Sequence, residues 1–182
     1  MSSYSSPCER ITNLSGYNIE MDYLYGQVMD GYSSHNLKRL KGDLPEKESS
    51  KALLELSRPF LGEGMKILEI GCSSGHLLRT LNKENLNLDY KGIDIDHYAI
   101  SKAQDALREV RFSGIASAEF FEAGAEEVPF DDNSFELVVS LNVLEHLKSP
   151  VKAIDEMIRC SSKAILIRTL DRKSTRLNSS HA

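Results

Sequence analysis

Lys66-Ile-Leu-Glu-Ile-Gly-Cys-Ser-Ser-Gly-His76 is the stretch that decides the fold, and Leu77-Leu-Arg-Thr-Leu81 follows it directly. It begins with a short apolar run of the kind found in a buried parallel strand. Two glycines, Gly71 and Gly75, then make a turn, and the leucines behind them share one side of a predicted helix. Because the first N–H groups of a helix have no internal partner, this turn suits an anion, although a plain tight turn without a ligand fits the same residues.

Length and composition describe one ordinary globular domain: 182 residues, 41% of them hydrophobic and 27% charged. The net charge of −5 argues against a surface that neutralises phosphates, so we expect no nucleic-acid partner. Three scattered cysteines give neither a disulfide framework nor a metal-ligand spacing. No apolar run is long enough to cross a membrane, and the first residues lack the apolar core of a secretory signal. We therefore expect a cytoplasmic protein with no membrane partner.

Strand and helix patterns alternate along the chain. We predict strands over residues 65–70, 88–95, 118–122, 135–140 and 164–170. Further helices are predicted over 46–61, over 97–110 with Asp96 as N-cap, and from Pro150 onward. The apolar positions predicted to face inward are Leu53, Leu54, Leu56 and Phe60, then Tyr98, Ile100, Ala103 and Leu107, and finally Val151, Ile154, Met157 and Ile158. This alternation indicates an α/β fold with a doubly wound parallel sheet covered on both faces.

The chain divides into three parts. Residues 1–43 are predicted to be a flexible or cap segment: the Ser-rich start has no pattern, and Tyr17 to Leu40 fits either a small helical cap over a ligand or a segment packed on the core. Residues 44–170 form the domain. Residues 171–181 match, residue for residue, one reading frame of a common sequencing adapter, so we interpret 171–182 as a non-native tail and expect the natural protein to be longer.

Asp94 is the carboxylate that a nucleoside-binding α/β fold requires. It ends the second predicted strand about twenty residues after Gly75, where a carboxylate can accept hydrogen bonds from both ribose hydroxyls. The alternative is a helix-capping role, for which Asp96 is better placed. A dinucleotide site would show Gly-x-Gly-x-x-Gly, whereas this chain has Gly-x-x-x-Gly with serines between, which disfavours NAD.

The chain resembles the class I S-adenosylmethionine-dependent methyltransferases over residues 65–170. The resemblance is carried, in family order and at family spacing, by Ile67-Leu-Glu-Ile-Gly-Cys-Ser-Ser-Gly75, Gly92-Ile-Asp-Ile95, Ala125-Glu-Glu-Val-Pro-Phe130 and Phe135-Glu-Leu-Val-Val-Ser-Leu-Asn-Val-Leu-Glu-His-Leu147. It implies a Rossmann-like sheet in the order 3-2-1-4-5, with five of the family's seven strands present. An edge strand left uncovered at 164–170 is then the expected route to an oligomer.

The resemblance also implies a set of residues that bind the cofactor, S-adenosylmethionine. These are Glu69 and the turn Gly71, Cys72, Ser73 and Gly75 at the methionine end, Asp94 at the ribose, Ile95 beside the adenine, Gly124, Ala125 and Glu126 at the adenine edge, and Leu141 and Asn142 facing the methionine and the reaction centre. Two residues depart from the family pattern. Ser73 replaces a common glycine, which is tolerated if its φ stays negative. Gly124 replaces a common aspartate, so adenine recognition is expected to use backbone groups and Glu126.

The expected activity is methyl transfer to a small-molecule or glycan-type acceptor. A sulfonium already makes its methyl group electrophilic, so alignment supplies most of the rate, and a base is needed only for a hydroxyl acceptor. Glu145 and His146 are the candidates for that base, although they also fit a role in orienting the turn before Pro150. We therefore assign no catalytic residue and no metal. The alternatives are a fragment that binds the cofactor without activity and an NAD-type oxidoreductase.

Overall fold

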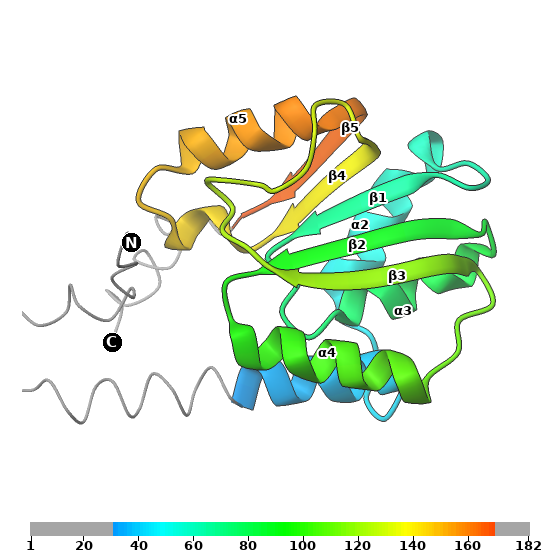
Figure 1. The fold of residues 1–182 in the computed structure, drawn as a ribbon. Helices are drawn as coiled ribbons and strands as arrows, with labels where there is room; N and C mark the ends of the chain where they lie inside the picture. Colours follow the sequence, from blue (N-terminus) through cyan, green and yellow to red (C-terminus); the bar gives the residue numbers. More distant parts are fainter. Residues whose placement is uncertain (1–30, 170–182) are drawn as a thin grey trace, which may run out of the picture.

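A parallel β-sheet forms the centre of the computed structural model, which describes residues 31–169 (Figure 1). Its five strands are β1 (Lys66–Ile70), β2 (Leu88–Asp94), β3 (Ile115–Glu122), β4 (Phe135–Leu141) and β5 (Ser161–Arg168). They pair in the order β3-β2-β1-β4-β5, with every neighbouring pair parallel. The predicted fold class and strand order are confirmed. The Ser-rich start and the interpreted tail lie outside the described residues and stay predictions.

Helices cover both faces of the sheet (Figure 1). They are α2 (Glu48–Ser57), α3 (His76–Leu81), α4 (His97–Glu109) and α5 (Pro150–Cys160), with single 3-10 turns η2 (Arg58–Phe60), η3 (Asn82–Glu84) and η4 (Leu144–His146). On one face α2, α3 and α4 enclose a core that includes Ile67, Leu77 and Tyr90. On the other face α5 packs over a second core around Leu68 and Met157. None of these helices within residues 31–169 is long and apolar enough to span a membrane.

Several predicted inward positions are wrong. Large apolar side chains lie on the solvent side of their elements: Leu56, Phe60, Tyr98, Val151 and Ile158. The contact face of α4 consists instead of three alanines and one isoleucine, namely Ala99, Ile100, Ala103 and Ala106. Because alanines allow a helix to approach a sheet closely, the small residues bury fully and the larger Tyr98 stays outside. Asp96 caps α4 as predicted, its side chain accepting a hydrogen bond from the Ala99 N–H at 3.1 Å.

Residues 31–41 form a helical segment, which we call the N-terminal helix. Leu40 is fully buried in the core beside α2 and α3, and Ser33 and Asn36 are buried as well. The sequence left two alternatives for Tyr17 to Leu40, a cap over a ligand or a segment packed on the core. Residues 31–40 of this segment pack on the core. The N-terminal helix also donates and accepts hydrogen bonds at the glycine turn, which brings it to the candidate site.

β5 lies at one edge of the sheet, where, among residues 31–169, it pairs only with β4. An edge strand with free N–H and C=O groups is a template for pairing with a second chain. We predict that the 182-residue chain dimerises or aggregates through this edge, as measured by size-exclusion chromatography. Replacing the exposed Ile167 with lysine should restore a monomer because a charge on the edge opposes pairing. A wild-type monomer at high concentration would contradict the prediction.

Candidate cofactor site

The residues expected to bind the cofactor gather at the carboxyl ends of the strands. In the parallel register Ile70 pairs with Ile93 on one side and with Ser140 on the other. The segments that follow β1, β2 and β4 therefore start beside one another. The Ala123 N–H donates to the Asp94 carbonyl at 3.0 Å, which brings the segment after β3 to the same edge. Four segments far apart in the sequence thus meet at the carboxyl ends of the strands.

Two glycines allow the turn after β1 to fold tightly against its neighbours. Gly71 and Gly75 have φ angles of +78° and +77°, a conformation that side-chain-bearing residues rarely adopt. A Cβ at Gly71 would lie 2.1 Å from Val143, in the segment after β4. A Cβ at Gly75 would lie 2.3 Å from the ring of Phe120. These close approaches explain why the motif requires glycine at both positions.

Four N–H groups of this turn, which the sequence suggested would be free for an anion, already have acceptors within the fold. The N–H groups of Gly71 and Cys72 both donate to the Ile93 carbonyl, at 2.8 and 3.0 Å. That of Ser73 donates to the Asp94 carboxylate at 2.7 Å, and that of Gly75 donates to the Cys72 carbonyl at 2.9 Å. Three of these N–H groups therefore donate to the end of β2, and the fourth closes the turn on itself. These four N–H groups are therefore not available to a phosphate.

Ser73 adopts a φ of +50°, whereas the sequence suggested that it is tolerated only with a negative φ. Two contacts support the unfavourable conformation. Its N–H reaches Asp94, and its hydroxyl accepts a hydrogen bond from the Asn36 side chain at 3.1 Å. A non-glycine residue in the left-handed region costs about 1–2 kcal/mol, which these hydrogen bonds offset.

Asp94 is held from both sides by backbone groups. Its Oδ2 accepts from the Ser73 N–H at 2.7 Å, and its Oδ1 accepts from the Asp96 N–H at 2.9 Å. Burial raises the pKa of Asp94 above its ordinary value, while these hydrogen bonds oppose that rise. Each carboxylate oxygen has a second lone pair, so the oriented carboxylate retains capacity for two more donors. A vicinal diol supplies such a pair.

Glu69 lies beneath the turn and is completely buried. Tyr90 donates its hydroxyl to Oε2 of Glu69, and Oε1 has no hydrogen-bond partner within residues 31–169. Burial raises the pKa of Glu69 to about 8, although the Tyr90 hydrogen bond acts in the opposite direction. A buried acceptor without a donor costs about 1–3 kcal/mol, so a hydrogen-bond donor that reached Oε1 would be stabilising.

The raised pKa of Glu69 should make the fold less stable as pH increases. Unfolded, Glu69 loses its proton near its ordinary pKa of 4.5, whereas folded it keeps the proton up to about pH 8. The folded state binds more protons between these values, so the free energy of unfolding falls by at most about 1.4 kcal/mol per pH unit. Glu69→Gln should remove this dependence and gain stability relative to wild type between about pH 5 and about pH 8 in urea unfolding. Parallel profiles for the two proteins would show that Glu69 is already ionised in the fold.

The residues expected at the adenine differ in how they are placed. Ile95 follows Asp94 directly and is 58% exposed, an apolar surface beside a polar site. Gly124 faces open space, with no atom within 4 Å of a Cβ built on it, and Ala125 is buried in the core. Glu126 accepts a hydrogen bond from the Ser149 N–H at 3.2 Å, at the start of α5. Its carboxylate therefore already has a structural partner, and its expected role at the adenine stays a prediction.

The segment after β4 carries the remaining expected residues. Leu141 is buried, and Asn142, at φ +58°, accepts a hydrogen bond from the Arg168 side chain. Glu145 lies in η4 and accepts from the Thr169 hydroxyl at 3.0 Å, and His146 is exposed. Their roles at the reaction centre stay predictions. Within the part of the chain that the structure describes, no group of three or more His, Cys, Asp or Glu side chains could hold a metal ion.

Four residues of this region were not predicted from the sequence: Ser33, Asn36, His76 and Tyr90. Tyr90 contacts Glu69 only because β1 and β2 pair in register, with Ile67 opposite Tyr90. His76 opens α3 and is buried, and this burial lowers its pKa to about 3, so that it is neutral. Strand pairing and helix packing create these contacts, and no local motif indicates them.

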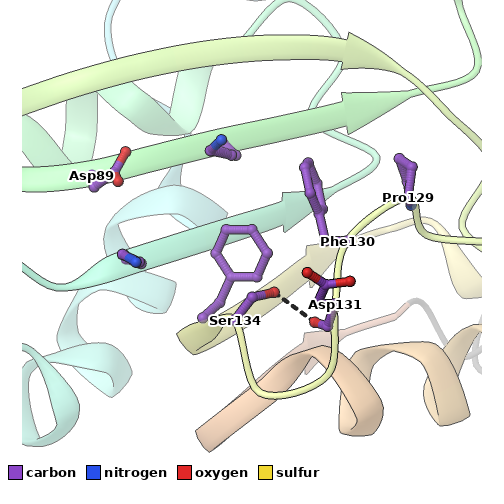
Figure 2. A pocket seen from close by; sticks show the side chains of 8 residues that line it. Asp89, Pro129, Phe130, Asp131 and Ser134 are labelled. Carbon is purple, nitrogen blue, oxygen red and sulfur yellow. Dashed lines mark hydrogen bonds between the residues drawn. The ribbon is translucent and has the colours of Figure 1, made fainter.

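A shallow pocket of about 250 Å³ lies elsewhere, at the amino ends of the strands (Figure 2). Its lining residues are Lys66, Asp89, Lys91, Pro129, Phe130, Asp131, Ser134 and Phe135. Two of its charged side chains already have partners, since Asp89 accepts a hydrogen bond from the Ser117 hydroxyl and the Lys91 ammonium lies 3.4 Å from the Glu119 carboxylate. Lys66 and Phe135 are the first residues of β1 and β4, whereas Asp94 is the last residue of β2, so the pocket lies at the other end of the strands from Asp94. None of the expected cofactor residues lines this pocket.

The fold is the Rossmann-like fold of class I methyltransferases. Residues 68–164 match the protein family described as "Methyltransferase domain", and the chain belongs to this family. Among solved structures, a SAM-dependent methyltransferase from Aquifex aeolicus has a TM-score of 0.54 at 20% identity, covering 63% of this chain and 61% of that one. The cyclase SpnF has the same TM-score at 24% identity, covering 61% and 40%. These likenesses show the fold, and the cyclase shows that the fold alone does not define a reaction.

Curated relatives match the same region. A cycloartenol-C-24-methyltransferase of Oryza sativa subsp. japonica is 31% identical over 53% of this chain and 27% of its own length. An ajmaline N-methyltransferase of Rauvolfia serpentina is 30% identical over 56% and 34%. The chain thus spans about a third of the length of these relatives. Their names give a carbon acceptor in one case and a nitrogen acceptor in the other, at nearly equal identity. The match therefore identifies the domain and leaves the acceptor open.

Proposed function

We propose that this chain binds S-adenosylmethionine at the carboxyl ends of β1, β2 and β4 and transfers its methyl group to a small-molecule or glycan-type acceptor. The observation that carries the proposal is the chemistry of the turn after β1. The N–H groups of Gly71, Cys72 and Ser73 donate to the end of β2, while the buried carboxyl group of Glu69 and the half-buried one of Asp94 lie beneath and beside the turn. The Asp94 carboxylate disfavours a phosphate beside it and favours a cationic ligand, and S-adenosylmethionine carries a sulfonium and an α-ammonium group.

The residues present fit this cofactor. Asp94 is oriented to accept hydrogen bonds from a ribose diol, and the exposed Ile95 beside it offers an apolar surface to an adenine. Oε1 of Glu69 is buried and has no hydrogen-bond partner within residues 31–169, so a hydrogen-bond donor that reached it would be stabilising. A bound S-adenosylmethionine supplies an electrophilic methyl group. The protein then has to align the acceptor and exclude water, for which no ionised base is required unless the acceptor is a hydroxyl.

Calorimetry with S-adenosylmethionine, S-adenosylhomocysteine and NAD tests the binding half of the proposal. We expect both sulfur ligands to bind and NAD not to compete. Binding of NAD alone would support the oxidoreductase alternative and overturn the proposal. Transfer is tested with radiolabelled S-adenosylmethionine and a panel of carbon, nitrogen and oxygen acceptors, including sugars. Tight binding without transfer to any acceptor would favour the alternative of a binding-competent but inactive chain.

A further inference from the structure

The N-terminal helix contacts the side chains of both residues whose backbone N–H groups orient the Asp94 carboxylate. One path runs through Asn36 and Ser73 to Oδ2, and the other runs through Ser33 and Asp96 to Oδ1. No sequence motif includes this helix, and the matched family region begins only at residue 68. The helix is therefore a part of the site that the family resemblance does not assign.

Asn36 makes the more strongly defined of the two paths. Its side chain is fully buried, and its Nδ2 donates to the Ser73 hydroxyl at 3.1 Å. Ser73 then donates its own N–H to Oδ2 of Asp94 at 2.7 Å. Because Ser73 holds a positive φ that serine disfavours, loss of the Asn36 contact would let the residue relax. Relaxation would rotate the Ser73 N–H away from Asp94.

Ser33 anchors the same helix on the other side of Asp94. Its hydroxyl donates to Oδ2 of Asp96 at 3.3 Å, and its carbonyl accepts from the Ser74 hydroxyl at 3.0 Å. The Asp96 N–H donates to Oδ1 of Asp94 at 2.9 Å. The helix is thus tied to the turn after β1 and to the end of β2 at once, and Asp94 lies between these two ties.

We propose that Asn36 is a positioning residue for ribose recognition, which acts on Asp94 through Ser73. This inference rests on the proposed function, since it assumes that Asp94 accepts hydrogen bonds from the ribose hydroxyls. It adds to that function a specific dependence on the N-terminal helix. Asn36 acts by orientation, because it contacts Ser73 in the turn and reaches the Asp94 carboxylate only through Ser73.

Calorimetry with S-adenosylhomocysteine and its 2′-deoxy analogue tests the proposal on the full chain. The wild type should prefer the ligand with both hydroxyls. Asn36→Ala should weaken S-adenosylhomocysteine binding about tenfold and weaken the 2′-deoxy analogue much less, so that the preference shrinks. Ser34→Ala is the matched control, because Ser34 is an exposed serine on the same helix with no hydrogen bond to the site. It should leave both affinities unchanged.

A rescue experiment separates positioning from a general loss of packing. Glycine adopts a positive φ without cost and has no hydroxyl to hold, so in a Ser73→Gly background Asn36→Ala should change the affinity by less than about twofold. If Asn36→Ala alone does not fold, Ser73→Ala removes the same hydrogen bond from the other side and should give the same loss of preference.

The outcomes are distinct. An undiminished effect of Asn36→Ala in the Ser73→Gly background would overturn the proposal, because Asn36 would then act independently of Ser73. Equal weakening of both ligands would overturn it as well, since the ribose would not be involved. Failure of the wild type to bind S-adenosylhomocysteine at all would instead refute the proposed function. Reduced preference with rescue by Ser73→Gly would support the inference.

Discussion

Asp94→Ala is expected to weaken S-adenosylmethionine binding by about 2–3 kcal/mol, roughly a 30- to 150-fold rise in Kd. The substitution removes a charged acceptor that backbone N–H groups on both sides hold in a single orientation. It also leaves the Ser73 N–H without its acceptor, so the strained turn loses support on the cofactor side. Titration calorimetry of the wild type and the variant measures the effect.

Asp96→Ala is the matched control for this experiment. The Asp96 side chain caps α4 and accepts from the Ser33 hydroxyl, whereas the contact with Asp94 is made by the backbone N–H of Asp96, which the substitution keeps. The control should therefore cost about 0.5–2 kcal/mol of stability, as loss of a helix N-cap does, with little change in affinity. If Asp96→Ala reduced the affinity more than Asp94→Ala, the roles assigned to the two aspartates would have to be exchanged.

Gly75→Ala should destabilise the fold by about 2–5 kcal/mol. Two costs add: alanine disfavours the φ of +77°, and its Cβ would stand 2.3 Å from the ring of Phe120. Phe120 cannot move away freely, since its ring packs edge-on against the buried Tyr90 at 5.7 Å between ring centres. Urea unfolding of both proteins at one pH measures the loss.

Gly124→Ala serves as the control for the glycine experiment. Gly124 has no positive φ, and no atom lies within 4 Å of the position its Cβ would take. The free energy of unfolding should change by no more than about 0.5 kcal/mol. Equal losses at Gly75 and Gly124 would mean that the turn after β1 tolerates a side chain and that the close approach to Phe120 is not a constraint.

Local sequence signals were sufficient to predict those features in which a residue acts within its own helix, strand or turn. The glycine turn, the helix cap at Asp96 and the alternation of strands with helices each follow from chemistry within a few residues. The strand order came from the family resemblance, and the register confirms it. Inward faces were predicted less well: Tyr98 and Val151 fit the apolar spacing of their helices, yet the structure exposes both. Spacing alone does not say which of two neighbouring helix sides meets the sheet.

The sequence by itself determined the class of the fold and the position of Asp94, because a strand end followed by a carboxylate is a local pattern that the parallel sheet must place at its carboxyl edge. Only the tertiary structure decided the burial, the hydrogen bonding and the backbone conformation of the groups around Asp94. Pairing of β1 with β2 buries Glu69 against Tyr90. It also brings the end of β2 to the N–H groups of Gly71, Cys72 and Ser73, which donate to it. Packing of the N-terminal helix supports Ser73 in its unfavourable φ through Asn36. These properties depend on hydrogen bonds between segments distant in the chain, and such bonds exist only once the sheet has formed.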